Sequence, residues 1–121
     1  MRLYAILRTD IPMSPGKAIA QAGHAYLEAA VKASDTAEGA AYAALCPGTK
    51  ITLAGGSEAE MLHLCEKLQA AGLTPHPIID RDHVELPHFD GSPILTAIGL
   101  GPIARDQAPG CLRKLKLFGK D

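Results

Sequence analysis

The stretch LYAILRTDIPMSPGKAIAQAGHA, residues 3–25, contains the signals that decide the fold. Residues 3–8 form a short apolar run typical of a buried strand, and the polar residues after it favour a turn. Ser14 can then cap a helix that begins at Pro15. Proline suits the first helical position because the N–H that it lacks would have no partner within the helix. The stretch predicts a strand, a turn and a helix that continues to about residue 33.

This helix is predicted to be amphipathic. At about 100° per residue, one side is made largely of apolar and small residues: Ile19, Gly23, Tyr26, Leu27 and Ala30. The other side carries a narrow polar row: Lys17, Gln21, His24 and Glu28. Spacing alone leaves open whether this row is a working surface or the solvent-facing side of an ordinary helix.

Strand and helix signals alternate in the rest of the chain. Ser57 and Glu60 form a capping box before a helix that Gly72 should end. A shorter helix is expected before it, with Asp35 and Glu38 in capping-box spacing. Further strands are expected at residues 50–54, 74–80, 93–99 and 112–118, with a short extended piece at 83–86.

The order of these elements predicts an α/β fold, a three-layer α/β/α sandwich around a four- to five-stranded mixed, mostly parallel sheet. Residues 1–121 are assigned to a single domain. In such sheets, ligand sites gather beyond the carboxyl ends of the strands. The polar groups expected to converge there are Arg8-Thr9-Asp10, Lys17 and Asp80.

Composition narrows the possible partners. Twelve Lys and Arg against thirteen Asp and Glu give a formal charge of −1, so no strong basic field indicates a nucleic acid, although residues 112–120 offer a small basic patch. Three distant cysteines without a CxxC pair argue against a disulfide framework or a metal site and favour a cytoplasmic location. No segment approaches the roughly 20 apolar residues that a membrane span needs.

Three polar side chains have a chemical argument of their own. Lys17 stands where helix N–H groups are free, a suitable seat for a phosphate or a developing oxyanion. His24 can serve as a general base or proton shuttle. Asp80 follows a strand, where a rigid sheet can aim it into a cleft. For each, an ordinary surface or hydrogen-bonded residue is the alternative.

The quoted stretch resembles the N-terminal signature of the peptidyl-tRNA hydrolase 2 family, in which an Arg-x-Asp strand end precedes a Met-x-x-Gly-Lys, Ala-Gln and His-Ala helix. The residues in register are Arg8, Asp10, Met13, Gly16, Lys17, Ala20, Gln21, His24 and Ala25. The similarity extends over nearly the whole chain, through residues 50–73, 78–80, 96–102 and 112–118.

The resemblance implies hydrolysis of the ester that joins a peptide to the 3′ end of a tRNA. It also implies a homodimeric α/β/α protein without a metal or organic cofactor. Carried over position by position, it implies catalytic roles for Lys17, His24 and Asp80 and substrate-binding roles for Arg8, Asp10 and Gln21.

The chain departs from the family pattern directly after Asp80. The family typically reads Asp-Ala-Gly-x-Thr, whereas this chain reads Asp80-Arg81-Asp82-His83-Val84, and Val84 lacks the threonine hydroxyl. Two other functions therefore stay open: a non-catalytic binding or interaction module on the same fold, and a small nucleotide- or phosphoester-binding protein that uses the start of the Lys17 helix.

Overall fold

The computed structural model describes residues 1–81 and 84–120, so Asp82, His83 and Asp121 lie outside the described residues. Four strands form the central sheet in the order β2-β1-β6-β3. These strands are β1 (Arg2–Arg8), β2 (Thr49–Gly56), β3 (His76–Asp80) and β6 (Ile94–Ile103).

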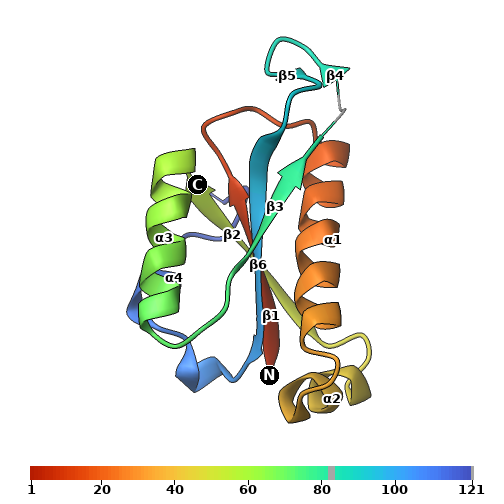
Figure 1. Cartoon of the computed structure of the whole chain (residues 1–121), viewed down its shortest axis with the longest axis vertical. Coiled ribbons are helices and arrows are strands. Elements are labelled where there is room, and N and C mark those ends of the chain that lie inside the picture. The colour runs from red at the N-terminus through yellow and green to blue at the C-terminus, as the bar shows by residue number, and fades with distance from the viewer. Residues whose placement is uncertain (82–83, 121) are drawn as a thin grey trace.

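Helices cover both faces of the sheet, as Figure 1 shows. One face carries α1 (Pro15–Lys32) and α2 (Ala37–Ala44), and the other carries α3 (Glu58–Ala70) and the short α4 (Gly110–Arg113). The shorter elements are β4 (Val84–Glu85), β5 (Phe89–Asp90) and a 3₁₀ turn at Arg105–Gln107. The predicted three-layer architecture around a four-stranded mixed sheet is confirmed.

The prediction of a mostly parallel sheet is wrong. Among the described strands, β1 and β2 form the one parallel pair, whereas β6 pairs antiparallel with both β1 and β3. A parallel neighbour needs a long crossover, usually through a helix, whereas antiparallel neighbours do not. The described residues between β3 and β6 contain the small β4–β5 hairpin and no helix, so β6 returns beside β3 in the opposite direction.

The helix α1 buries a different side from the one predicted, one that includes Lys17 and Gln21 but leaves His24 exposed. Its buried residues are Lys17, Ala18, Gln21, Ala25 and Ala29, whereas Ile19 and Leu27 are exposed. The cause is close packing through small residues, because a Cβ added at Gly99 of β6 would lie 2.2 Å from the Ala25 carbonyl oxygen. Summed hydrophobicity favours isoleucine and leucine, but three alanines lie on the buried side of the helix.

The two sides of the sheet accordingly have different cores. Large side chains fill the α3 side, among them Ile6, Met61, Leu68 and Ile98. Small ones dominate the α1 side, among them Ala5, Ala18, Ala25 and Ala97. The strand β1 contributes to both clusters, which agrees with its predicted burial on both faces.

Helix ends follow the sequence signals with one exception. The Ser57–Glu60 capping box is present at α3, and Gly72 after the helix adopts a φ of +84°. For α2 the predicted Asp35 cap is wrong. Thr36 caps the helix instead, and its hydroxyl accepts a hydrogen bond from the Gly39 N–H at 3.0 Å.

The predicted final strand at residues 112–118 is also wrong. The segment begins within α4 and then touches β2 through one isolated bridge, between Leu53 and Leu117. Backbone hydrogen bonds from Ala54 N–H to Lys116 and from Phe118 N–H to Thr52 flank that bridge. The C-terminal segment therefore covers an edge of the sheet without forming a regular strand.

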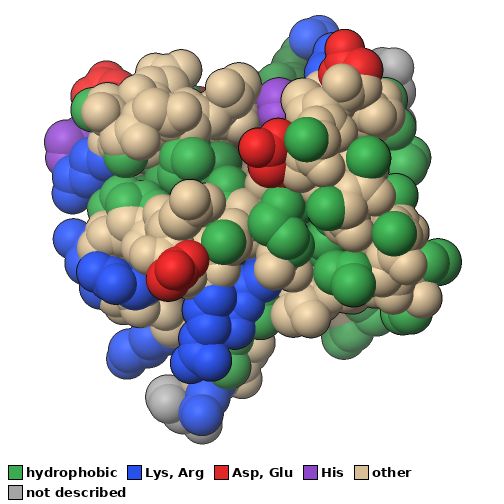
Figure 2. All heavy atoms as spheres, turned by 90° about the horizontal axis from the view of Figure 1, so that it is seen from below, with side chains coloured by type: hydrophobic (Ala, Val, Ile, Leu, Met, Phe, Trp, Pro, Cys, Tyr) green, Lys and Arg blue, Asp and Glu red, His purple; other side chains and the backbone are tan. Residues whose placement is uncertain are grey.

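Figure 2 views the end of the molecule that carries α2 and the N-terminus. Lys and Arg side chains gather on one side of this end, and apolar side chains dominate the other. A cavity of about 580 Å³ is lined by Arg2, Arg105 and Arg113, and Arg113 belongs to the predicted basic patch.

Within residues 1–81 and 84–120, no helix has the length and hydropathy needed to cross a bilayer.

We expect Gly99→Ala to lower the free energy of unfolding by about 1–3 kcal/mol, because the new Cβ must displace α1 from β6. Gly23→Ala is the matched control on α1, where an added Cβ meets no atom within 4 Å. The control should raise the free energy of unfolding by about 0.5–1 kcal/mol. Urea unfolding followed by circular dichroism measures both, and equal effects would contradict the close packing.

Candidate active site

An ion pair joins the first turn of α1 to the end of β3. The Lys17 ammonium donates a hydrogen bond to Asp80 Oδ2 at 2.6 Å. Ser14 caps α1 by accepting a hydrogen bond from the Lys17 N–H, and Pro15 begins the helix, as predicted. The fold thus brings together two of the polar groups expected beyond the strand ends.

The two partners of this pair differ in their access to solvent. The Lys17 side chain is 3% exposed and the Asp80 side chain 17% exposed. The buried ring of Phe89 covers the lysine, with its centroid 4.2 Å from Nζ, a cation–π contact. Solvent therefore reaches the carboxylate rather than the ammonium.

Phe89 belongs to the β4–β5 hairpin, which is held against the start of α1. The Ser14 hydroxyl donates a hydrogen bond to Glu85 Oε2 at 3.4 Å, so the residue that caps the helix also contacts the hairpin. The sequence predicted a loop at residues 81–92 with a short extended piece at 83–86, which overlaps β4, but it did not predict the role of Phe89. Its signal was a lone phenylalanine in an otherwise polar segment.

A second polar contact lies one helical turn further along α1. Gln21 Oε1 accepts a hydrogen bond from the Thr96 hydroxyl at 2.5 Å, and both residues are buried. Ile78 pairs with Ala97 and Ile79 with Leu95, which leaves Thr96 as the extra residue of a β-bulge. Thr96 was not predicted, although it is the polar residue in an apolar strand.

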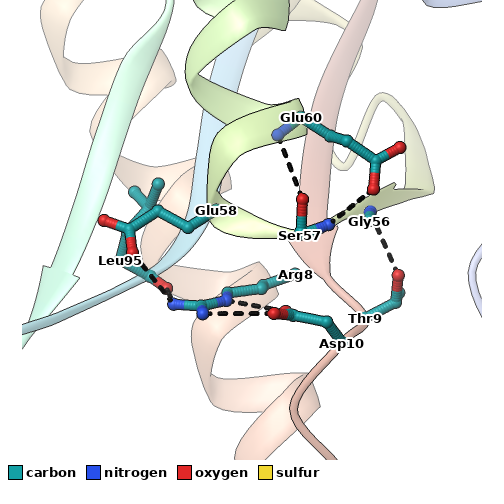
Figure 3. A network of polar contacts seen from close by, with 8 residues as sticks. All are labelled: Arg8, Thr9, Asp10, Gly56, Ser57, Glu58, Glu60 and Leu95. Atoms are coloured by element: carbon teal, nitrogen blue, oxygen red, sulfur yellow. Dashed lines mark hydrogen bonds and ion pairs between the residues drawn. The ribbon is translucent and has the colours of Figure 1, made fainter.

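The predicted residues Arg8 and Asp10 form a separate network on the α3 side (Figure 3). Arg8 binds Asp10 through Nε at 2.7 Å and Nη2 at 3.2 Å. Its Nη1 donates to the Leu95 carbonyl at 3.3 Å and lies 3.8 Å from Glu58 Oε2. In the described part of the chain, no hydrogen bond or ion pair links this network to Lys17.

Arg8 also changes the titration of its partner. The hydrogen bonds and charge of Arg8 hold the pKa of the Asp10 carboxyl below its usual value. Nearby, the Thr9 hydroxyl accepts a hydrogen bond from the Gly56 N–H at 3.0 Å. These contacts connect β1, β2, β6 and α3, so their first effect is to fix the strand ends.

His24 lies apart from the ion pair but on the same groove as Asp80. It is exposed on α1, and no hydrogen bond or ion pair joins it to Lys17 or Asp80 in the described residues. The groove has a volume of about 490 Å³ and runs between α1 and β3; we call it the α1–β3 groove. Its lining residues are His24, Leu27, Glu28, Val31, Pro77, Ile78, Ile79 and Asp80.

The part of the chain that the structure describes holds no group of three His, Cys, Asp or Glu side chains suited to a metal ion. The functional groups of the candidate site are the Asp80 carboxylate, the enclosed Lys17 ammonium and the His24 imidazole. Such groups can bind a polar substrate, orient water and transfer protons.

Comparison with known proteins identifies the family. The family model described as "Peptidyl-tRNA hydrolase PTH2" matches residues 1–118. The chain belongs to this family. The "Probable peptidyl-tRNA hydrolase 2" of Dictyostelium discoideum is 32% identical to this PTH2-family chain over 114 residues, which are 93% of the chain and 52% of that relative. The chain thus spans about half the length of this relative.

Two archaeal relatives of this PTH2-family chain match it over nearly their full length. The peptidyl-tRNA hydrolase of Methanocaldococcus jannaschii is 31% identical over 119 residues, which are 98% of the chain and 100% of that relative. The peptidyl-tRNA hydrolase of Pyrobaculum aerophilum is 33% identical over 121 residues, 98% of both chains.

Asp80→Asn should lower the free energy of unfolding by about 3 kcal/mol, because the enclosed Lys17 ammonium loses its counter-charge. We take the lower end of the destabilisation expected when one partner of a buried ion pair is removed, because Asp80 retains some contact with solvent. The double variant Lys17→Met/Asp80→Asn removes both charges and should recover most of the loss. Urea unfolding tests the pair, and simple addition of the two single effects would contradict the coupling.

Asp10→Asn should lower the free energy of unfolding at pH 7 and have less effect in acid. The pKa of the Asp10 carboxyl is lower in the folded than in the unfolded protein. Its contact with Arg8 therefore stabilises the fold fully above the unfolded pKa, near pH 4, and this contribution is lost as the pH falls through the folded pKa. Asp35→Asn is the control, at an exposed position without an ion pair in the described residues. A pH-independent difference would contradict the Arg8 contact.

Proposed function

We propose that this chain hydrolyses the ester bond of peptidyl-tRNA and releases free tRNA and peptide. Membership of the PTH2 family over residues 1–118 supports this activity. The observation that carries the proposal is the Lys17–Asp80 pair, a solvent-accessible carboxylate held by an enclosed ammonium on the wall of a groove. Both residues stand at positions that the family signature associates with the active site.

Ester hydrolysis needs a positioned water, a group that takes its proton, and donors where the carbonyl oxygen becomes negative. We assign Asp80 to orient the water and accept its proton, either directly or through His24 on the same groove. The water oxygen then bonds to the ester carbonyl carbon, and the bond from that carbon to the ribose oxygen breaks. The ribose oxygen leaves with the proton that Asp80, directly or through His24, accepted from the water.

The sequence suggested that Lys17 holds a phosphate or the developing oxyanion. Its enclosure favours a different role, because Nζ already binds Asp80 and the Phe89 ring covers it. We assign Lys17 to fix the position of the Asp80 carboxylate. Direct contact between this ammonium and the substrate requires Phe89 to move.

The remaining assignments extend the same proposal. Gln21 holds the Thr96 bulge beside the pair, and Arg8 and Asp10 fix the strand ends, so these three residues support the site rather than bind substrate directly. Residues 1–121 act as a single domain, which the span of the family match supports. The resemblance implies a homodimer, which sedimentation velocity tests, and the three distant cysteines favour a cytoplasmic location.

Release of free tRNA from purified peptidyl-tRNA tests the proposal. Asp80→Asn and Lys17→Ala should each slow turnover on the order of a hundredfold, the loss typical of a proton acceptor or an electrostatic group. Lys32→Ala, at an exposed lysine of the same helix, should leave turnover unchanged. Circular dichroism at the assay temperature separates lost chemistry from lost folding.

The altered segment after Asp80 favours a second candidate, a non-catalytic binding module. Val84 is exposed and has no hydroxyl, Arg81 is exposed, and Asp82 and His83 lie outside the described residues. This candidate predicts no hydrolysis by the wild-type chain beside an active control enzyme, even after Val84→Thr. Hydrolysis by the wild-type chain rejects it.

A further inference from the structure

The α1–β3 groove exposes a continuous set of apolar side chains beside the carboxylate of the candidate site. Leu27 and Val31 on α1 are 64% and 58% exposed, and Ile79 on β3 is 44% exposed. All three line the groove together with Asp80. The lining residues come from α1 and from β3, whose end lies near α1 in Figure 1. Contiguous exposed apolar surface of this kind commonly marks a binding site.

The charges of the groove argue against RNA as its occupant. Among the described residues that line it there is no Lys or Arg, whereas Glu28 and Asp80 are present. Lys17 is enclosed behind Asp80, and Lys32, 3.9 Å from Glu28, lies outside the lining. Phosphate contacts from Lys and Arg supply most of the affinity for nucleic acids. A groove lined by apolar side chains and two acidic groups offers no Lys or Arg contact from its described residues to the phosphates of a nucleotide chain.

We infer that the α1–β3 groove binds the peptide portion of peptidyl-tRNA and favours apolar side chains next to the ester. This inference rests on the proposed hydrolysis, which requires the ester carbonyl to lie at Asp80. From that point the substrate continues in two directions, as a peptide and as a nucleic acid. The peptide is the half that can bury apolar side chains against Leu27, Val31 and Ile79.

The helix α1 offers a matched pair of variants to test this assignment. Leu27 lines the groove, whereas Ile19 is 73% exposed on the same helix and does not line it. Leu27→Glu and Ile19→Glu make the same chemical change in the same helix, and neither side chain is buried. Circular dichroism should show both variants folded like the wild type.

The substrates are acetyl-Leu-Leu and acetyl-Gly-Gly esters of one tRNA. Wild-type kcat/KM should favour the leucyl substrate by about tenfold, as an apolar pocket discriminates modestly. Leu27→Glu should remove most of this preference by lowering kcat/KM for the leucyl substrate alone, and Ile19→Glu should retain the preference. Binding of the corresponding non-hydrolysable 3′-amides should show the same ratios in Kd.

The amide measurement separates failure of this inference from failure of the proposed function. A wild-type chain that does not hydrolyse either ester rejects the hydrolase proposal, and the Kd ratio still decides what the groove binds. Equal Kd values for the two amides overturn the inference. So does a loss of affinity for deacylated tRNA in Leu27→Glu, which indicates an RNA surface. A third result also overturns the inference: Leu27→Glu changes the oligomeric state and lowers kcat/KM equally for both substrates. The groove would then be an interface between copies of the chain.

Discussion

The close approach of α1 to the sheet is the constraint on which the other features depend. The Ala25 carbonyl lies where a side chain at residue 99 would otherwise stand, and alanines line the contact. At this distance, the side of the helix that carries Ala18, Ala25 and Ala29 faces the strands. That orientation turns Lys17 and Gln21 inward, toward β3 and β6, and turns Leu27 outward. The ion pair and the groove both follow from this one contact.

The features that the sequence predicted correctly are those with a local signal. The bounds of α1, its Ser14 cap and the Ser57–Glu60 capping box depend on residues a few positions apart, and all are present. The α1 orientation and the strand directions were wrong because both depend on contacts between distant segments. Residue hydrophobicity does not encode how closely a helix approaches a sheet, and it does not encode in which direction β6 runs beside its neighbours.

The candidate site shows the same division. The meeting of Lys17 with Asp80 was predictable, because one residue begins a helix and the other ends a strand, and such positions gather at one edge of a sheet. The environment of the pair was not predictable. Phe89 reaches Lys17 from a separate hairpin, and Thr96 reaches Gln21 only because a bulge inserts one extra residue in β6.

The β4–β5 hairpin forms its own two-stranded sheet and shares no strand pairing with the four central strands. Its length and sequence can therefore change without altering the register of the scaffold. Any such change would alter the cover over the Lys17 ammonium, because Phe89 belongs to the hairpin. Evolution can thus vary the shielding of one buried cation without changing the strand pairing of the central sheet, because loop segments commonly tolerate insertion and deletion.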